Sequence, residues 1–185
     1  MNIKCVCLLV ALLASFSVSA QESGDYKINS GDVLQIFVWN EEALTREVIV
    51  RSDGFVSIPL AGELRAGGQT PGQLTEAIAT ALGKYLNDKP VVTVSLQSMA
   101  GNIIYVLGKV NRPGAYPVTA RVDVTQALAL AGGLNSFADE DDIQILRRDE
   151  AGAQRAISFD YSGVKSGEDL DTNIVLQSGD VVIVP

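Results

Sequence analysis

The chain has 185 residues, and 47% of them are hydrophobic, which is enough to bury one core or two small ones. Its net charge of -8 disfavours binding to nucleic acid or to an anionic lipid surface, because both depend on cationic side chains that meet phosphates. It contains no histidine, so the commonest general base and zinc ligand is missing. The composition therefore favours a folded protein that is not an enzyme and needs no cofactor.

Residues 1–20 are typical of a signal peptide. Lys4 precedes an uncharged, largely apolar stretch, residues 5–18, that is too short to span a bilayer comfortably, and a small-x-small cleavage site ends at Ala20. We expect cleavage after Ala20, and an uncleaved membrane anchor is the alternative. Both cysteines lie inside this segment, and Gln21 stands where a lipoprotein would need a cysteine. The mature protein is therefore expected to have no disulfide and no lipid anchor.

The first half of the mature chain begins with a turn that leads into a strand. Ser30-Gly31-Asp32 precedes the apolar residues 33–38, where glycine tolerates a positive φ and the aspartate can accept local backbone N–H groups. Residues 41–47 are predicted to form a loop or a single turn. Residues 48–50 and 55–58 flank Asp53-Gly54 and are predicted to pair as a hairpin. Pro59 then ends the second strand, because proline has no N–H to donate.

The clearest helix is predicted to start at residue 71, after a turn over residues 66–69. Thr70 is the N-cap, Pro71 occupies the first helical position, and Gln73 completes a capping box. One apolar stripe follows, made of Leu74, Ala77, Ile78, Ala81, Leu82, Tyr85 and Leu86. Residues 91–96 alternate as a strand after Pro90.

The second half is predicted to open with a hairpin and a helix that crosses it. The apolar residues 103–107 turn through Gly108 and again through Pro113-Gly114 into the extended residues 115–118. Asp123 then caps a helix whose apolar face repeats at helical spacing, with Gln126 three residues on as in a capping box. That face is formed by Val124, Ala127, Leu128 and Ala131, and Gly132-Gly133 ends the helix.

The remaining residues are predicted to form strands joined by polar loops. Asp139–Asp142 invite a calcium or glycosidase interpretation, but adjacent carboxylates supply neither alternating ligands nor two groups opposed across a cleft, so a solvated loop is favoured. Strands are predicted over residues 143–148 and 156–159, with a turn at Gly152 and a helix-free surface loop over residues 160–172. A second Ser-Gly-Asp turn, at Gly179-Asp180, directly precedes the last predicted strand, residues 181–184. We interpret the aspartates of both Ser-Gly-Asp turns as structural caps.

The two halves thus share a plan, which predicts an α+β fold of two small tandem modules. Each module is expected to hold a hairpin, a crossing helix and a Ser-Gly-Asp strand at an outer edge of its sheet. We expect the boundary within residues 97–102.

Two sets of motifs resemble known families. Gly108-x-Val110-x-x-Pro113-Gly114-x-Tyr116, followed by Thr125-x-x-Leu128-x-x-Ala131-Gly132-Gly133, resembles a soluble-ligand-binding β-grasp (SLBB) domain. Four upstream motifs, Gly31-Asp32, Asp53-Gly54, Ile58-Pro59-Leu60-x-Gly62 and Gly67-x-Gln69-Thr70, resemble the polysaccharide export domain of outer-membrane polysaccharide export proteins. The structural signature residues of both resemblances are Gly31, Asp32, Asp53, Gly54, Pro59, Gly62, Gly67, Thr70, Gly108, Pro113, Gly114, Tyr116, Gly132, Gly133, Gly179 and Asp180. The resemblance implies an export domain over residues 21–98 and an SLBB domain over residues 103–185.

By this resemblance, the protein is expected to be a non-enzymatic periplasmic part of a machine that exports a capsule, exopolysaccharide or biofilm polysaccharide. It would form a homo-oligomeric ring that links an inner-membrane polysaccharide copolymerase to an outer-membrane pore. Long family members end in an amphipathic helix that lines the pore, whereas this sequence stops at Pro185 directly after residues 181–184. We therefore expect a short, periplasmic member whose pore is a β-barrel or a long family member.

Two other functions remain open from the sequence. The first is a monomeric β-grasp module that binds a glycan, peptidoglycan or a small ligand. Its stacking platforms would be aromatic side chains, and the candidates are Trp39, Tyr105, Tyr116 and Tyr161, although aromatics in and beside strands more often belong to the core. The second is a periplasmic glycan hydrolase or lyase, for which only Asp53, Asp123 and the acidic run are available, each already explained by a turn, a cap or a loop.

Overall fold

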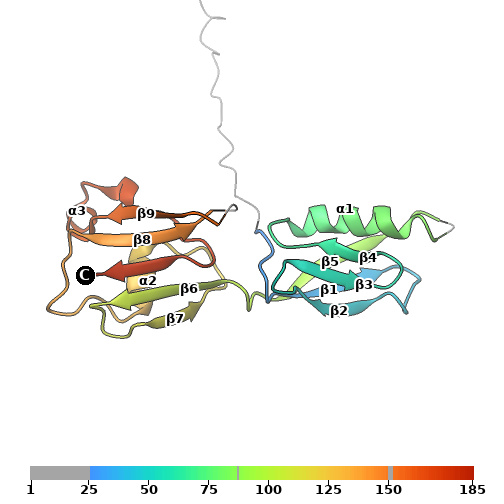
Figure 1. Ribbon diagram of the computed structural model, residues 1–185, viewed down its shortest axis with the longest axis horizontal. Helices are drawn as coiled ribbons and strands as arrows, with labels where there is room; N and C mark the ends of the chain where they lie inside the picture. The colour runs from blue at the N-terminus through green and yellow to red at the C-terminus, as the bar shows by residue number, and fades with distance from the viewer. Residues whose placement is uncertain (1–25, 87, 150–151) are drawn as a thin grey trace, which may run out of the picture.

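The computed structural model describes residues 26–86, 88–149 and 152–185. These residues form two modules that lie side by side, each with a sheet and at least one helix (Figure 1). Each module has its own cluster of buried apolar side chains. The predicted α+β fold of two modules is therefore confirmed. The expected signal peptide lies outside the described residues.

The first module is built on a three-stranded antiparallel sheet of order β2-β1-β5, with a separate two-stranded sheet, β3-β4. The helix α1 packs against β5 and β4. Its core is formed by Leu34, Ile36 and Val38 of β1 together with Leu74, Ile78 and Leu82 of α1. The elements are β1 (Val33–Val38), β2 (Arg46–Ile49), β3 (Phe55–Ile58), β4 (Gly62–Arg65), α1 (Pro71–Leu82) and β5 (Val92–Ser98).

The predicted hairpin between residues 48–50 and 55–58 is wrong. The turn itself forms, since Gly54 has a φ of 82° and its N–H donates to the Arg51 carbonyl at 2.9 Å. It joins two different sheets, however, because Val50 continues the β1–β2 pairing, exchanging backbone hydrogen bonds with Gly31 and Asp32 at 2.8 and 2.9 Å. β3 instead pairs with β4, whose residues, Gly-Glu-Leu-Arg, show no apolar alternation from which the sequence could predict a strand.

The second module is a five-stranded sheet of order β7-β6-β10-β8-β9. β10 lies at its centre, parallel to β6 and antiparallel to β8, and the β6–β7 hairpin forms as predicted. The helix α2 packs against β6. The elements are β6 (Ile103–Gly108), β7 (Gly114–Pro117), α2 (Val124–Leu130), β8 (Ile143–Arg148), β9 (Gln154–Phe159), α3 (Tyr161–Ser166), the 3₁₀ helix η2 (Leu170–Thr172) and β10 (Val181–Val184).

The strands that follow the two Ser-Gly-Asp turns are central, so their predicted position at an outer edge is wrong. β1 lies between β2 and β5, and β10 lies between β6 and β8. Both strands are almost continuously apolar, whereas edge strands usually carry charged residues or proline that keep them from pairing with another chain.

The two predicted capped helices are confirmed, including both capping boxes at Thr70 and Asp123. The first helix ends at Leu82, so Tyr85 and Leu86 do not extend its apolar stripe, and Tyr85 is exposed. The helix-free loop predicted over residues 160–172 is wrong, because it contains α3 and η2. Asp160 caps α3 by accepting the Gly163 N–H at 2.8 Å, and this hydrogen bond lowers the pKa of its carboxyl.

A buried ion pair anchors the second module. Arg147 on β8 donates from Nη2 to Asp180 Oδ2 at 2.6 Å and from Nε to Asp180 Oδ1 at 3.0 Å. Asp180 also accepts the Gln177 N–H at 2.8 Å, so the carboxylate caps its own turn and neutralises the guanidinium. Both side chains are almost fully buried. Removing one partner of such a pair leaves a buried charge unsatisfied, which costs far more than losing an exposed pair.

Replacing Arg147 with alanine is expected to lower the free energy of unfolding by about 3–5 kcal/mol. The neighbouring Arg148 is exposed and donates to the Gly152 carbonyl, so Arg148→Ala serves as the matched control, with an expected change within about 0.5 kcal/mol. Urea denaturation followed by circular dichroism measures both variants. Equal losses for the two variants would contradict the anchoring role of the Arg147–Asp180 pair.

Candidate functional site

The two modules are joined by residues 99–102, and Gly101 in this linker is held by the Ser-Gly-Asp turns of both modules. On the side of the first module, the Gly101 N–H donates to Asp32 Oδ1 at 3.0 Å. On the side of the second module, Ser178 Oγ donates to the Gly101 carbonyl at 2.8 Å. Both backbone polar groups of Gly101 are thus satisfied by side chains, one from each module. We call this arrangement the junction clasp.

The junction clasp leaves no room for a side chain at position 101. A Cβ built on Gly101 would lie 2.2 Å from the Ser30 carbonyl oxygen, a separation that real Cβ atoms essentially never show. The obstructing atom belongs to the backbone, so a rotamer change cannot relieve the clash. Only glycine lets the linker approach the first turn closely enough to make the hydrogen bond to Asp32.

Asp32 is fully buried and connects several segments. Besides the Gly101 N–H, its carboxylate accepts the Asn29 N–H at 2.8 Å and the Tyr26 hydroxyl at 2.7 Å. Burial, followed by the hydrogen bond to Asp32, raises the pKa of Tyr26 well above its usual value, so the phenol stays neutral and remains a donor. The carboxylate is therefore occupied by structural donors and is not available as a general base.

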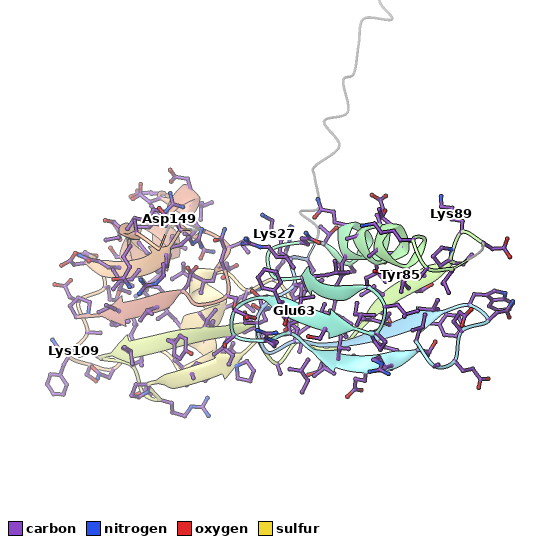
Figure 2. The ribbon with its side chains drawn as sticks, turned by 45° about the vertical axis from the view of Figure 1, so that its right-hand side comes forward. Lys27, Glu63, Tyr85, Lys89, Lys109 and Asp149 are labelled. Atoms are coloured by element: carbon purple, nitrogen blue, oxygen red, sulfur yellow. The ribbon has the colours of Figure 1, made fainter. Side chains whose placement is uncertain are left out.

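A cleft of about 720 Å³ lies at the junction of the modules. The first module lines it with residues 26–29 and Gly68, and the second with residues 118–121 and 175–178. Lys27 contributes a cation at this junction, as Figure 2 shows, and Arg121 contributes another. The described residues that line the cleft include no Asp or Glu. The cleft can therefore bind a polar ligand, but it does not offer the two carboxylates that glycoside hydrolysis requires.

The candidate acidic residues of the sequence do not converge elsewhere. Asp53 forms an ion pair with Arg51 and accepts the Phe55 N–H at 3.2 Å, while Asp123 caps α2. Within the acidic run, Asp141 accepts a hydrogen bond from Ser162. Over the part of the chain that the structure describes, no group of three or more His, Cys, Asp or Glu residues is placed to hold a metal ion.

The four candidate stacking aromatics fall into two pairs. Tyr116, in β7, and Tyr161, the first residue of α3, are half-buried and pack against the second core. Trp39 is 61% exposed and Tyr105 is 39% exposed, so the expectation that they belong to the core is wrong. Trp39 directly follows the last residue of β1, and Tyr105 points away from the core of its sheet, which a local pattern cannot reveal.

The five-stranded sheet has a group of apolar side chains on one open face, beside the exposed Gln144, that the sequence analysis did not identify. The strand register aligns Tyr105 of β6 with Val181 of β10 and Leu146 of β8, and the next positions of β6 and β10 on the same face are Leu107 and Ile183. These five side chains are half-buried or exposed, whereas the side chains that alternate with them, Ile104, Val106, Ile145, Val182 and Val184, are buried in the core. We call them the open face. The signal in the sequence was the lack of polar alternation in residues 103–107 and 181–184, since continuous apolar runs are typical of strands covered on both faces.

Among the described residues, no helix combines the length and the apolar character that crossing a membrane would require.

Two family models match the chain. The model described as polysaccharide biosynthesis/export protein matches residues 20–97, and the SLBB domain model matches residues 103–158. Together they span well over half of the chain, one on each module. The chain therefore belongs to the polysaccharide export family, with an SLBB domain in its second module.

Relatives named as polysaccharide export or exopolysaccharide production proteins agree with this family. The capsule polysaccharide export outer membrane protein CtrA of Neisseria meningitidis is 27% identical over 175 residues, which cover 84% of this chain and 43% of CtrA. The EPS I polysaccharide export outer membrane protein EpsA of Ralstonia nicotianae is 26% identical over 183 residues, covering 86% of this chain and 47% of EpsA. The exopolysaccharide production protein ExoF of Rhizobium meliloti is 29% identical over 138 residues, covering 68% of this chain and 32% of ExoF. The chain thus spans less than half the length of these relatives.

Replacing Gly101 with alanine is expected to open the junction clasp while both modules stay folded. The new methyl group would displace the Ser30 carbonyl, which costs about 1–3 kcal/mol when the backbone must shift. We expect a larger radius of gyration in small-angle X-ray scattering, with the chemical shifts of both cores retained. Gly114→Ala is the matched control, because nothing lies within 4 Å of the added Cβ there. Unchanged scattering in Gly101→Ala would show that the clasp does not hold the modules together.

Proposed function

We propose that this protein is a non-enzymatic periplasmic component of a machine that exports a capsule or exopolysaccharide. The observation that carries the proposal is the match of both modules, in the same chain, to the polysaccharide export and SLBB family models. The names of CtrA and EpsA, which are both described as polysaccharide export outer membrane proteins, support the same role. The dispersed carboxylates described above favour transport over hydrolysis.

We further propose that copies of the chain assemble into a ring through the open face. Apolar side chains on one exposed sheet face gain about 25 cal/mol for each Å² that assembly removes from water. A stable interface needs roughly 800 Å² on each partner, so the contact must extend from the open face onto the neighbouring edge strands. In this arrangement the ring links an inner-membrane polysaccharide copolymerase to an outer-membrane pore, formed by a β-barrel or by a longer family member.

A conduit has to release its cargo, and the surface of this protein suits that requirement. The junction cleft has hydrogen-bonding groups and cations beside apolar side chains, and its described lining has no opposed carboxylates, so it offers hydrogen bonds without a means of cutting the polymer. The polymer would therefore pass intact. Incubating the purified protein with the polysaccharide should leave the chain length unchanged, and shorter products would contradict the non-enzymatic role.

Deletion of the gene tests the proposed function directly. We expect polysaccharide to accumulate inside the cell envelope and to disappear from the medium and the cell surface, as measured by fractionation and sugar analysis. Expression of the wild-type chain from a plasmid should restore secretion. Normal secretion in the deletion strain would overturn the export role.

Charged substitutions on the open face test the ring. Tyr105→Asp and Leu107→Asp place carboxylates on the proposed interface, where burial without a partner is costly, so the molar mass measured by light scattering is expected to fall to that of a monomer. Leu170→Asp is the control, because Leu170 is also exposed and apolar but belongs to η2, outside the open face. If all three variants keep the mass of the wild type, another surface mediates assembly.

A further inference from the structure

An exposed aromatic pair stands at the end of the first module that lies away from the junction. The backbone N–H of Trp39 donates to the Val91 carbonyl at 3.0 Å, and Lys89, two residues before Val91, lies at the far end of the module in Figure 2. Trp39 and Phe37 are 61% and 44% exposed. Their ring centroids are 6.4 Å apart at an interplanar angle of 69°, the edge-to-face geometry that aromatic pairs prefer. Phe37 therefore supports the indole while much of its surface stays accessible.

A small hollow of about 260 Å³ adjoins this pair. Its lining combines the two aromatic rings with the polar side chains of Asn40, Glu41 and Glu42. Sites for drug-sized ligands usually enclose roughly 300–1,000 Å³, so this hollow suits one or two sugar rings rather than a helix of a partner protein.

The loop that forms the hollow is held in one conformation by its own hydrogen bonds. Thr45 Oγ1 accepts the Val38 N–H at 3.0 Å, and the Thr45 N–H donates to the Glu41 carbonyl at 3.2 Å. Leu44 is buried in the core and fixes the middle of the loop. A loop that is already ordered loses little conformational entropy when a ligand binds, which favours binding to a small surface.

The polar side chains of the hollow have unused hydrogen-bonding capacity. Among the described residues, Asn40, Glu41 and Glu42 have no side-chain hydrogen-bond partner. Carboxylate and amide oxygens accept hydrogen bonds from hydroxyl groups, and the hydroxyls of a sugar are such donors. A pyranose ring has an apolar C–H face and a rim of hydroxyl groups. The aromatic ring can stack on the C–H face, and the neighbouring oxygens can accept hydrogen bonds from the hydroxyl groups.

The charge of the hollow selects among sugars. Its lining contains two carboxylates and no Lys or Arg, and the whole chain carries a net charge of -8. A uronic or sialic acid would bring a third carboxylate close to Glu41 and Glu42, and like charges at such distances repel. Uncharged sugar units avoid this cost.

We propose that Trp39, supported by Phe37 and flanked by Asn40, Glu41 and Glu42, binds uncharged sugar units of the exported polysaccharide. This inference rests on the proposed export function and names the part of the cargo that the protein contacts. The binding is weak, with a dissociation constant on the order of 1 mM, because a conduit must release each unit.

Trp39 is the only tryptophan of the chain, so its indole N–H resonance reports on this site alone. In a titration followed by nuclear magnetic resonance, cellopentaose, maltopentaose and chitopentaose are the uncharged probes, and oligogalacturonate is the charged probe. We expect a saturable shift of the indole resonance with at least one uncharged probe, and binding of oligogalacturonate that is about tenfold weaker or more.

Three variants separate stacking from other contacts. Trp39→Ala should remove the shifts of the backbone amides of residues 40–45 with the uncharged probes, and Trp39→Phe should restore part of them, because it keeps an aromatic face. Phe137→Ala removes another exposed aromatic ring, in the second module, and should bind as the wild type does. Trp39 is exposed and its loop is anchored by Leu44, so these variants should keep the fold.

The proposal is overturned if no uncharged probe shifts the indole resonance, if oligogalacturonate binds as well as the uncharged probes, or if Trp39→Ala binds normally. A loss of molar mass in Trp39→Ala, with no sugar binding by the wild type, would identify a protein contact instead and would also overturn it. These outcomes leave the export function intact as long as deletion of the gene blocks secretion. Normal secretion in the deletion strain is a separate failure of the proposed function.

Discussion

The hydrogen bonds that Gly101 makes to both Ser-Gly-Asp turns are the constraint on which the arrangement of the two modules depends. Each module has a separate core, so apolar burial alone would leave them as two bodies on a short linker. Asp32 and Ser178 instead bind the N–H and the carbonyl of the same residue, and the absence of a side chain at Gly101 allows this close approach. Because Asp32 is buried and also bound by Tyr26 and Asn29, its position is fixed by the first module before it meets the linker.

The same turn sequence performs two different tasks in the two modules. In both turns the aspartate accepts an N–H three residues earlier, from Asn29 in the first module and Gln177 in the second. Asp32 also accepts the Gly101 N–H in the linker, whereas Asp180 also forms an ion pair with Arg147 inside the second core. The first module thus uses its buried carboxylate to bind the linker, and the second module uses its buried carboxylate to join its own strands. The resulting unit presents chemically different surfaces: the junction cleft with its two cations, the open face and the hollow beside Trp39.

Local signals in the sequence predicted much of the fold. Thr70 with Gln73 and Asp123 with Gln126 predicted α1 and α2, since a capping box is complete within four residues. The failures concern partners that are distant in the chain. The prediction of a turn at Asp53-Gly54 was correct, but the sequence could not show that β2 would pair with β1 and β3 with β4. Arg147 and its partner Asp180 are 33 residues apart, and the exposure of Trp39 and Tyr105 depends on which face of a sheet is left uncovered.

Backbone ¹⁵N relaxation of the wild-type mature protein tests most directly whether the junction clasp makes the two modules one body. If it does, residues of β1 and β5 and residues of β6 and β10 will report the same overall correlation time, that of a particle with the mass of the whole protein or of its assembly. Two different and shorter correlation times, one for each module, would show that the modules tumble independently and would contradict the role assigned to Gly101.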